Sequence, residues 1–240
     1  MNSTDEKDKI FWDSLSVYGN TIFIAGTTGV IIEFSLTEGI KNRYETELDN
    51  PYLQQTSSTV FAIGRWNTEW ITIEKKTNKT KKYASLFSGR TTAVATFESQ
   101  FFIAGADKDE NAVTKKDSVK LKEGLLYLIS GAFEKELRNL PTRGRIQNLA
   151  FSKKWMAYVD DENKNTLVLK NRTNNTEKKI DEKSPITATF SLSENIYYAI
   201  TGEVIQFDEN VIQRISFKEK DISILKIAEA AGKIHVLTSK

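Results

Sequence analysis

The stretch Gly19-Asn-Thr-Ile-Phe-Ile-Ala-Gly26 places a polar turn before a short apolar run that ends in small residues. The chain repeats the turn and the apolar run five more times, often with a small residue at the end, at intervals of 38, 41, 54, 41 and 38 residues. The later copies are Ser57-Ser-Thr-Val-Phe-Ala-Ile-Gly64, Glu98-Ser-Gln-Phe-Phe-Ile-Ala-Gly105, Ser152-Lys-Lys-Trp-Met-Ala-Tyr-Val159, Ser193-Glu-Asn-Ile-Tyr-Tyr-Ala-Ile200 and Ala231-Gly-Lys-Ile-His-Val-Leu-Thr238. Polar residues 107–120 account for the long interval as an inserted loop, so a period of about forty residues runs through the chain.

Each apolar run has further strand-like segments on both sides. An apolar stretch precedes it, such as residues 146–151 or 186–190, and an alternating stretch follows it, such as residues 30–34 or 125–129. A more polar fourth segment comes next, for example residues 79–83. Alternation with a period of two, rich in β-branched and aromatic residues and bounded by Gly, Asn, Asp and Ser, predicts β-strands. We therefore predict an all-β chain with four strands in each repeat.

Two apolar inner strands, one amphipathic strand and one polar outer strand in every repeat form the blade of a β-propeller. In its period and strand pattern the chain resembles the WD40-like propeller repeat over nearly its whole length, although the Gly-His and Trp-Asp signatures of that family are missing from their places. The regular period disfavours a two-sheet sandwich, and its length disfavours most solenoids. We predict a single β-propeller domain of about six blades over residues 10–240, after a polar N-terminal tail of residues 1–9.

The last predicted blade is incomplete, because only residues 222–228 and 233–238 supply strands to it. An uncovered sheet edge promotes aggregation, and proteins usually cover such edges. The charged N-terminal tail is one candidate cover. A partner polypeptide that donates strands by β-augmentation is another. A last blade that is simply short is the third interpretation.

Motifs for catalysis are scarce in this sequence. The chain has no cysteine and one histidine, His235, so it lacks a thiol nucleophile and any catalytic triad independent of that residue. It contains no Walker-type or dinucleotide-binding glycine pattern, and the acidic segment 107–111 lacks the glycine that a calcium loop requires at Ala112. A carboxylate hydrolase would need acids on the innermost strands, where Asp13 is the only one. We expect no enzyme, no cofactor and no bound metal.

Aromatic and basic residues supply the candidate binding sites. Candidate contacts for a protein partner are Arg65, Trp66, Trp70, Arg143, Arg145 and His235. Exposed Trp and Arg are typical anchors of interfaces, whereas Trp in a propeller often packs between blades. Four lysines of one predicted hairpin are candidates for phosphate binding, namely Lys75, Lys76, Lys81 and Lys82. Lysines on outer strands also protect sheet edges, which is the alternative interpretation.

The overall charge does not select a partner. With 34 basic and 32 acidic side chains the net charge is +2, so any charged binding must come from a local patch. The first ten residues are polar and acidic, unlike a signal peptide, and no apolar run approaches the ~18 residues of a membrane span. We expect an intracellular protein, cytoplasmic or nuclear, without a membrane partner.

The expected function is that of a non-catalytic scaffold subunit that binds other protein subunits of a larger complex. The alternative is a propeller that binds RNA or DNA backbone through its lysine hairpins.

Overall fold

The computed structural model describes residues 12–108, 121–130, 134–140, 142, 144–192, 195–208, 211–218, 222–230 and 233–238. Every regular element in these ranges is a β-strand. No helix in the described part of the chain is long and apolar enough to cross a membrane. The chain divides into two compact units, residues 1–91 with 107–120 and residues 92–106 with 121–240.

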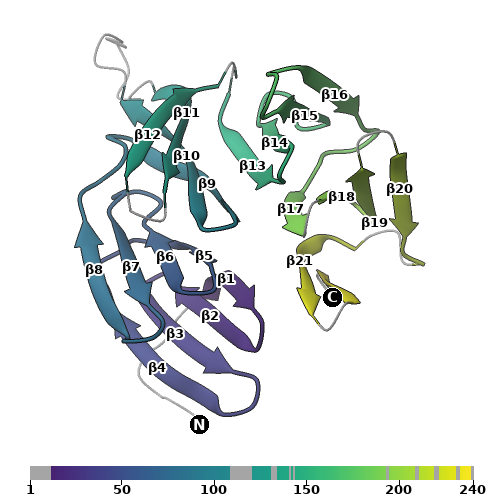
Figure 1. Ribbon diagram of the computed structural model, residues 1–240. Helices are drawn as coiled ribbons and strands as arrows, with labels where there is room; N and C mark the ends of the chain where they lie inside the picture. The colour runs from purple at the N-terminus through teal and green to yellow at the C-terminus, as the bar shows by residue number, and fades with distance from the viewer. Residues whose placement is uncertain are drawn as a thin grey trace. The chain divides into compact units, whose positions relative to one another are not determined.

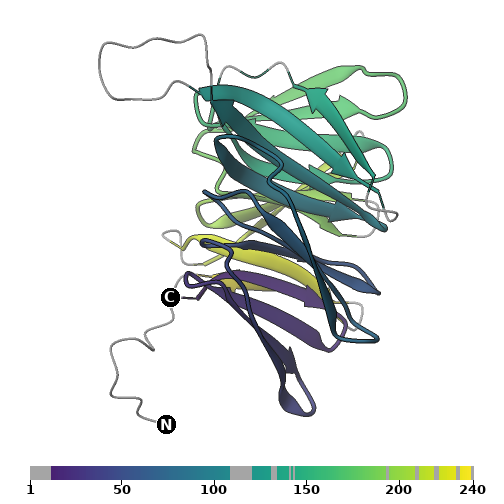
Figure 2. The ribbon, with the colours of Figure 1, turned by 90° about the vertical axis from the view of Figure 1, so that its left-hand side faces the viewer.

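The first unit contains two antiparallel sheets, drawn in purple and blue (Figure 1, Figure 2). One sheet consists of β1 (Trp12–Tyr18), β2 (Thr21–Gly26), β3 (Val30–Ser35) and β4 (Gly39–Glu45); the other consists of β5 (Tyr52–Gln55), β6 (Thr59–Ile63), β7 (Trp70–Glu74) and β8 (Lys79–Tyr83). Strand order follows chain order in both sheets. The first strands β1 and β5 lie together, where the amide of Leu53 donates a hydrogen bond of 2.9 Å to the Ser14 hydroxyl.

The second unit contains three further four-stranded sheets and one two-stranded sheet. The four-stranded sheets are β9 (Arg90–Phe97) with β10 (Gln100–Lys108), β11 (Leu121–Ile129) and β12 (Lys135–Asn139); β13 (Ile146–Phe151) with β14 (Trp155–Asp160), β15 (Thr166–Asn171) and β16 (Glu177–Asp181); and β17 (Ala188–Leu192) with β18 (Asn195–Ile200), β19 (Glu203–Asp208) and β20 (Val211–Ser216). The two-stranded sheet pairs β21 (Ile224–Ala230) with β22 (Lys233–Thr238). The first two residues of β9 and the last two of β10 belong to the first unit.

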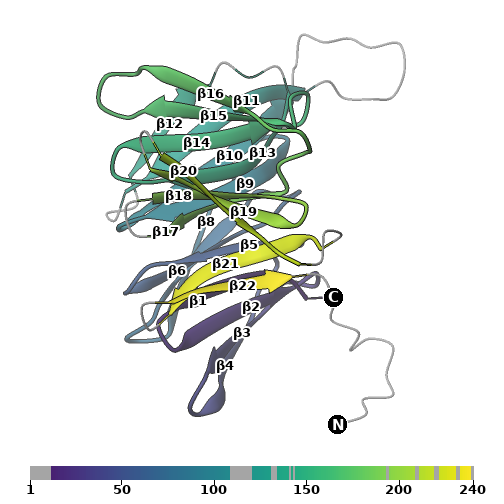
Figure 3. The same cartoon turned by 90° about the vertical axis from the view of Figure 1, so that its right-hand side faces the viewer.

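Apolar side chains cover both faces of the inner strands. One buried cluster joins the sheets β9–β12 and β13–β16, where the rings of Phe102 and Phe151 stack with their centroids 3.5 Å apart. A second cluster joins β13–β16 to β17–β20, which lies beside it in Figure 3. All six residues of β14 are buried as a result. Burial on both faces explains why these strands read as continuous apolar runs.

Within the described residues the structure has five four-stranded blades, so the prediction of about six is wrong. The difference is the last predicted blade, for which two strands are described. The two strands predicted for that blade are present as β21 and β22. The first two residues of the predicted insertion, Asp107 and Lys108, extend β10 instead. The N-terminal tail and residues 109–120 lie outside the described residues.

Three blades share a glycine close to the start of the third strand. Gly29, Gly124 and Gly202 all have positive φ angles, at 80°, 78° and 72°. In each case the glycine carbonyl accepts a hydrogen bond from the first residue after the fourth strand, so the glycine connects the third strand to the end of its blade. A Cβ atom at Gly29 would lie 2.5 Å from the carbonyl oxygen of Thr46 and 2.6 Å from that of Leu48. Glycine is required there both by φ and by space.

The substitution Gly29→Ala should destabilise the protein more than Gly39→Ala. Both glycines have a φ of 80°, but nothing lies within 4 Å of a Cβ atom at Gly39. The backbone conformation alone costs an alanine about 1–2 kcal/mol, and displacement of two backbone carbonyls should bring the loss at Gly29 above about 3 kcal/mol. Urea unfolding of the two variants measures the difference. Equal losses would contradict a steric requirement at Gly29.

A buried carboxylate in the second unit holds β20, the fourth strand of its sheet, by an ion pair. The side chain of Glu182 is 3% exposed, accepts a hydrogen bond of 2.6 Å from the Tyr198 hydroxyl, and forms an ion pair of 2.8 Å with Arg214 on β20. Nη1 of Arg214 contacts Glu182 at 3.1 Å and also lies 3.2 Å from a carboxylate oxygen of Glu203. Burial and, after it, the hydrogen bond to Glu182 raise the pKa of Tyr198 above its ordinary value. The hydroxyl therefore stays protonated and donates to the carboxylate.

The substitution Glu182→Ala should lower the free energy of unfolding by about 3 kcal/mol, because it leaves the buried Tyr198 hydroxyl and the Arg214 guanidinium without their acceptor. The substitution Glu203→Ala removes only the more exposed partner of Arg214 and should cost less than about 1 kcal/mol. Denaturant unfolding of both variants tests this ranking. A loss at Glu203 as large as that at Glu182 would contradict it.

Candidate interaction sites

The loop between β6 and β7 and the first residue of β7 carry the predicted aromatic and arginine anchors in the first unit. The amide of Arg65 donates 2.8 Å to the Asp49 carbonyl, and its guanidinium lies 4.3 Å from the ring centre of Tyr52. Trp66 is 57% exposed. Trp70, by contrast, is fully buried and stacks on Tyr83 with ring centroids 3.8 Å apart. This burial favours the packing interpretation for Trp70 over a partner contact, and Arg65, Trp66 and Trp70 all stay predicted contacts.

The four lysines of the β7–β8 hairpin do not converge on one site. Lys75 donates 2.5 Å to the Thr56 carbonyl, and Lys82 pairs with Glu47 at 2.6 Å and with Glu69 at 3.1 Å. Lys81 points to the opposite face of β8 from Lys82, and its ammonium lies 5.0 Å from the Tyr83 ring centre. Lys76 is exposed to solvent. Phosphate binding stays a prediction for these lysines, and this geometry does not favour it.

Lys75 has an unusual environment for a lysine in this hairpin. Its ammonium lies 4.7 Å from the ring centre of Tyr18. Burial lowers the pKa of Lys75 from 10.5 to about 8, and the charge of Glu33 offsets part of that effect. This lysine is therefore partly neutral in mildly alkaline solution.

The pKa of Lys75 has a measurable consequence for stability. The unfolded chain binds more protons than the folded chain between about pH 8 and 10.5, so the contribution of Lys75 to the free energy of unfolding should rise with pH across that window and stay constant below it. The variant Lys75→Met should lose this increment, and Lys76→Met, which removes an exposed neighbour, should keep it. Nitrogen NMR of labelled lysines, assigned with the same variants, should show the Lys75 amine titrating near pH 8. A midpoint near 10.5 would contradict this environment.

Arg145 serves the fold of the second unit. Its Nε lies 3.1 Å from the carboxylate of Asp161, and its amide donates 2.7 Å to the same side chain. These contacts connect the start of β13 to the loop between β14 and β15. Arg143 lies outside the described residues. His235 stands on β22 opposite Ala228, and its side chain is not described. Arg143, Arg145 and His235 all stay predicted partner contacts.

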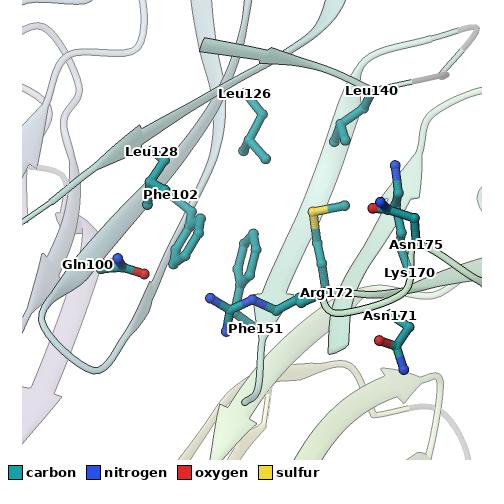
Figure 4. A pocket seen from close by; sticks show the side chains of 11 residues that line it. Gln100, Phe102, Leu126, Leu128, Leu140, Phe151, Lys170, Asn171, Arg172 and Asn175 are labelled. Atoms are coloured by element: carbon teal, nitrogen blue, oxygen red, sulfur yellow. The ribbon is translucent and has the colours of Figure 1, made fainter. Parts of the chain in front are cut away.

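The second unit contains a hollow that the sequence did not indicate. It lies between the sheets β9–β12 and β13–β16, has a volume of about 450 Å³, and is shown in Figure 4. Its lining comprises Gln100, Phe102, Leu126, Leu128, Leu140, Phe151, Met156, Lys170, Asn171, Arg172 and Asn175. The apolar members come from four strands and one connection, and most polar members come from the end of β15 and the β15–β16 hairpin. No local motif could have predicted a site assembled from so many segments.

Arg172 is the best-defined polar group of this hollow. Its amide donates 2.8 Å to the Lys154 carbonyl, and Nη1 donates 2.7 Å to the Ser152 carbonyl. The guanidinium carbon lies 5.7 Å from the ring centre of Phe102 and 5.8 Å from that of Phe151. Two backbone contacts and the stacked rings thus hold a positive charge beside an apolar wall.

No group of three or more His, Asp or Glu side chains within the described ranges is placed to hold a metal ion. The expectations that the protein binds no metal or cofactor and is no enzyme stay predictions.

No protein-family profile and no curated protein matches the chain. Among solved structures, a chain of the mitotic checkpoint complex matches with a TM-score of 0.69 and 10% identity, over 98% of this chain and 75% of that one. U3-55K matches with a TM-score of 0.60 and 8% identity, over 80% of this chain and 61% of that one. Streptogramin B lyase matches with a TM-score of 0.57 and 11% identity, over 94% of this chain and 89% of that one. The chain thus spans less than two thirds of the U3-55K chain.

These similarities define the class of fold. The chain is an all-β propeller, and the matches to U3-55K and to the mitotic checkpoint complex confirm the resemblance to WD40-like proteins at the level of architecture. Identities of 8–11% support the fold alone. Since one of the three matches is named a lyase, the fold does not decide between binding and catalysis.

Proposed function

We propose that this protein is a non-catalytic scaffold subunit that binds other protein subunits, and that strands of a partner polypeptide complete its sheet β21–β22. The observation that carries the proposal is an exposed isoleucine, Ile215, on the outer strand of the preceding blade, next to a sheet that has two strands in the described residues.

The strand register places Ile215 on the face of β19–β20 that meets β21. Ile215 of β20 lies directly opposite Val204 of β19, so the two side chains point to the same side of the sheet. Val204 is 1% exposed and packs in one cluster with Ile224 and Ile227 of β21. Ile215 is 53% exposed. The inner part of the face is therefore covered and the outer part is not.

A neighbouring blade shows what covers such a face. Between β13–β16 and β17–β20, Leu167 and Leu169 of the third strand β15 pack in one cluster with Ile205 and Phe207 of β19. In the described residues, β21–β22 has no third strand to play this part for the opposite face of β19–β20. A donated strand beside β22 would cover Ile215 and supply the missing backbone partners.

The free edge of β22 supports the same conclusion. Among the described strands, β22 pairs with β21 alone, which leaves its other edge with unpaired N–H and C=O groups. Such edges associate readily with a further strand. The mitotic checkpoint complex includes a chain of this fold, which is consistent with a subunit role. We further propose a cytoplasmic or nuclear location, which is compatible with a fold that does not depend on disulfide bonds.

The variant Ile215→Lys should lose the partner, and Ile40→Lys should keep it. Ile40 is 68% exposed on β4, the outermost strand of a complete blade, and is the matched control for a surface lysine. After affinity purification from the source cells with nuclease treatment, mass spectrometry should find a stoichiometric protein with the wild type. Its recovery should fall about ten-fold or more with Ile215→Lys, because a lysine on the covered face would be desolvated.

Three results would contradict the proposal. Equal recovery with both variants would show that the partner does not use this face. Partners lost on nuclease treatment would favour the nucleic-acid alternative. A chain recovered alone as a stable monomer, and destabilised by removal of residues 1–9, would show that its own tail completes the sheet.

A further inference from the structure

We infer that the hollow between β9–β12 and β13–β16 is a second protein-binding site, which takes a peptide segment carrying a large apolar side chain next to a carboxylate. This inference rests on the proposed protein-binding function. It adds the kind of peptide that a second site would bind, at strands far along the chain from β22.

The size of the hollow exceeds what a packed interior leaves empty. Protein interiors hold few voids larger than a water molecule, whereas a volume of about 450 Å³ lies in the range of ligand-binding pockets. The flanking sheets are otherwise closely packed, with Phe102 and Phe151 stacked at 3.5 Å. The hollow therefore has room for a large side chain and part of its neighbouring backbone.

Part of the wall can receive an apolar group. Six side chains supply the apolar surface, namely Phe102, Leu126, Leu128, Leu140, Phe151 and Met156. Leu126 and Met156 are 2% and 7% exposed and therefore form the floor of the hollow. An aromatic or branched aliphatic side chain placed there would lose contact with water on most of its surface.

The charge of the lining favours an acidic neighbour for that group. Lys170 and Arg172 are the charged residues among the eleven that line the hollow, and both are positive. The other polar members are the amides Gln100, Asn171 and Asn175. A cationic ligand would meet two like charges, whereas a carboxylate would gain two charge-assisted contacts.

A second, smaller hollow differs from this one in the charges of its lining. It has a volume of about 210 Å³, and its lining combines Lys153 and Lys154 with Asp208. Its charges are of both signs, so it selects no particular ligand charge. The larger hollow combines apolar depth with charge of a single sign, and Arg172 is already held by Ser152 and Lys154 in the orientation described above. Such preorganisation lowers the cost of binding.

The test uses the purified full chain and a phage library of random dodecapeptides. Clones that bind the wild-type protein are then incubated with the variant Leu128→Trp, whose larger side chain fills the hollow, and clones that also bind this variant are removed. The retained peptides should share a large apolar residue within about two positions of Asp or Glu. A synthetic peptide of that consensus should bind about ten-fold more weakly to Lys170→Glu, and within about two-fold of wild type to Lys164→Glu, an exposed lysine outside the hollow.

Met156 provides a direct reporter of occupancy. The chain has two methionines, Met1 and Met156, so carbon-labelled methionine methyl groups give a signal from inside the hollow that is simple to assign. The peptide should shift the Met156 methyl resonance and leave that of Met1 in place. This readout and Lys170→Glu keep the test valid if Leu128→Trp fails to fold.

The inference is overturned if no peptide is retained, if the retained peptides lack acidic residues, or if they bind without moving the Met156 resonance. A shift caused by 3-indolepropionate, with no peptide retained, would reassign the hollow to small carboxylates. Failure here, together with loss of the natural partner in Ile215→Lys, leaves the strand-donation proposal standing. Acidic peptides that bind the hollow, together with an inert Ile215→Lys, would instead leave only the hollow as a protein-binding site.

Discussion

The inner strands of this protein are apolar on both faces, and each blade needs a neighbour on each side to keep those faces from water. The strand β14 shows the constraint most clearly, since all six of its residues are buried between two other sheets. No blade can satisfy this requirement alone, because a single sheet covers neither of its own faces. The repeat of about forty residues in the sequence follows from this condition, because each repeat must present the same pair of sheet faces to the next repeat.

Both proposed binding sites are places where this covering is incomplete. At Ile215 the face of a blade extends beyond the two strands that pack on it, which leaves a large apolar side chain 53% exposed. Around Phe102 and Phe151 two complete sheets meet but leave a hollow, and Arg172 holds a positive charge at its side. The first site invites backbone pairing, whereas the second invites a side chain. A scaffold subunit with both could hold one partner as part of its fold and recruit another through a short segment.

The sequence predicted the second strands of the blades best, because burial on both faces leaves a continuous apolar run that no other part of the repeat imitates. Outer strands were harder: β16 reads Glu177-Lys-Lys-Ile-Asp181, with one apolar residue in a solvated strand. Trp66 and Trp70 are four residues apart, yet only Trp70 is buried, since its position depends on stacking with Tyr83 from the next strand. The hollow was beyond prediction, because it depends on how side chains from five strands and two connections fit together. The predicted number of about six blades counted the incomplete last blade, whose two strands form a separate two-stranded sheet in the structure.

The central claim is that a partner polypeptide pairs with the free edge of β22. Hydrogen–deuterium exchange of the backbone amides in residues 233–238 tests it directly, when measured on the isolated chain and on the chain within its purified native complex. Amides on the outer edge of β22 should exchange rapidly in the isolated chain and become strongly protected in the complex, together with those around Ile215. Equal exchange in both states would contradict strand donation.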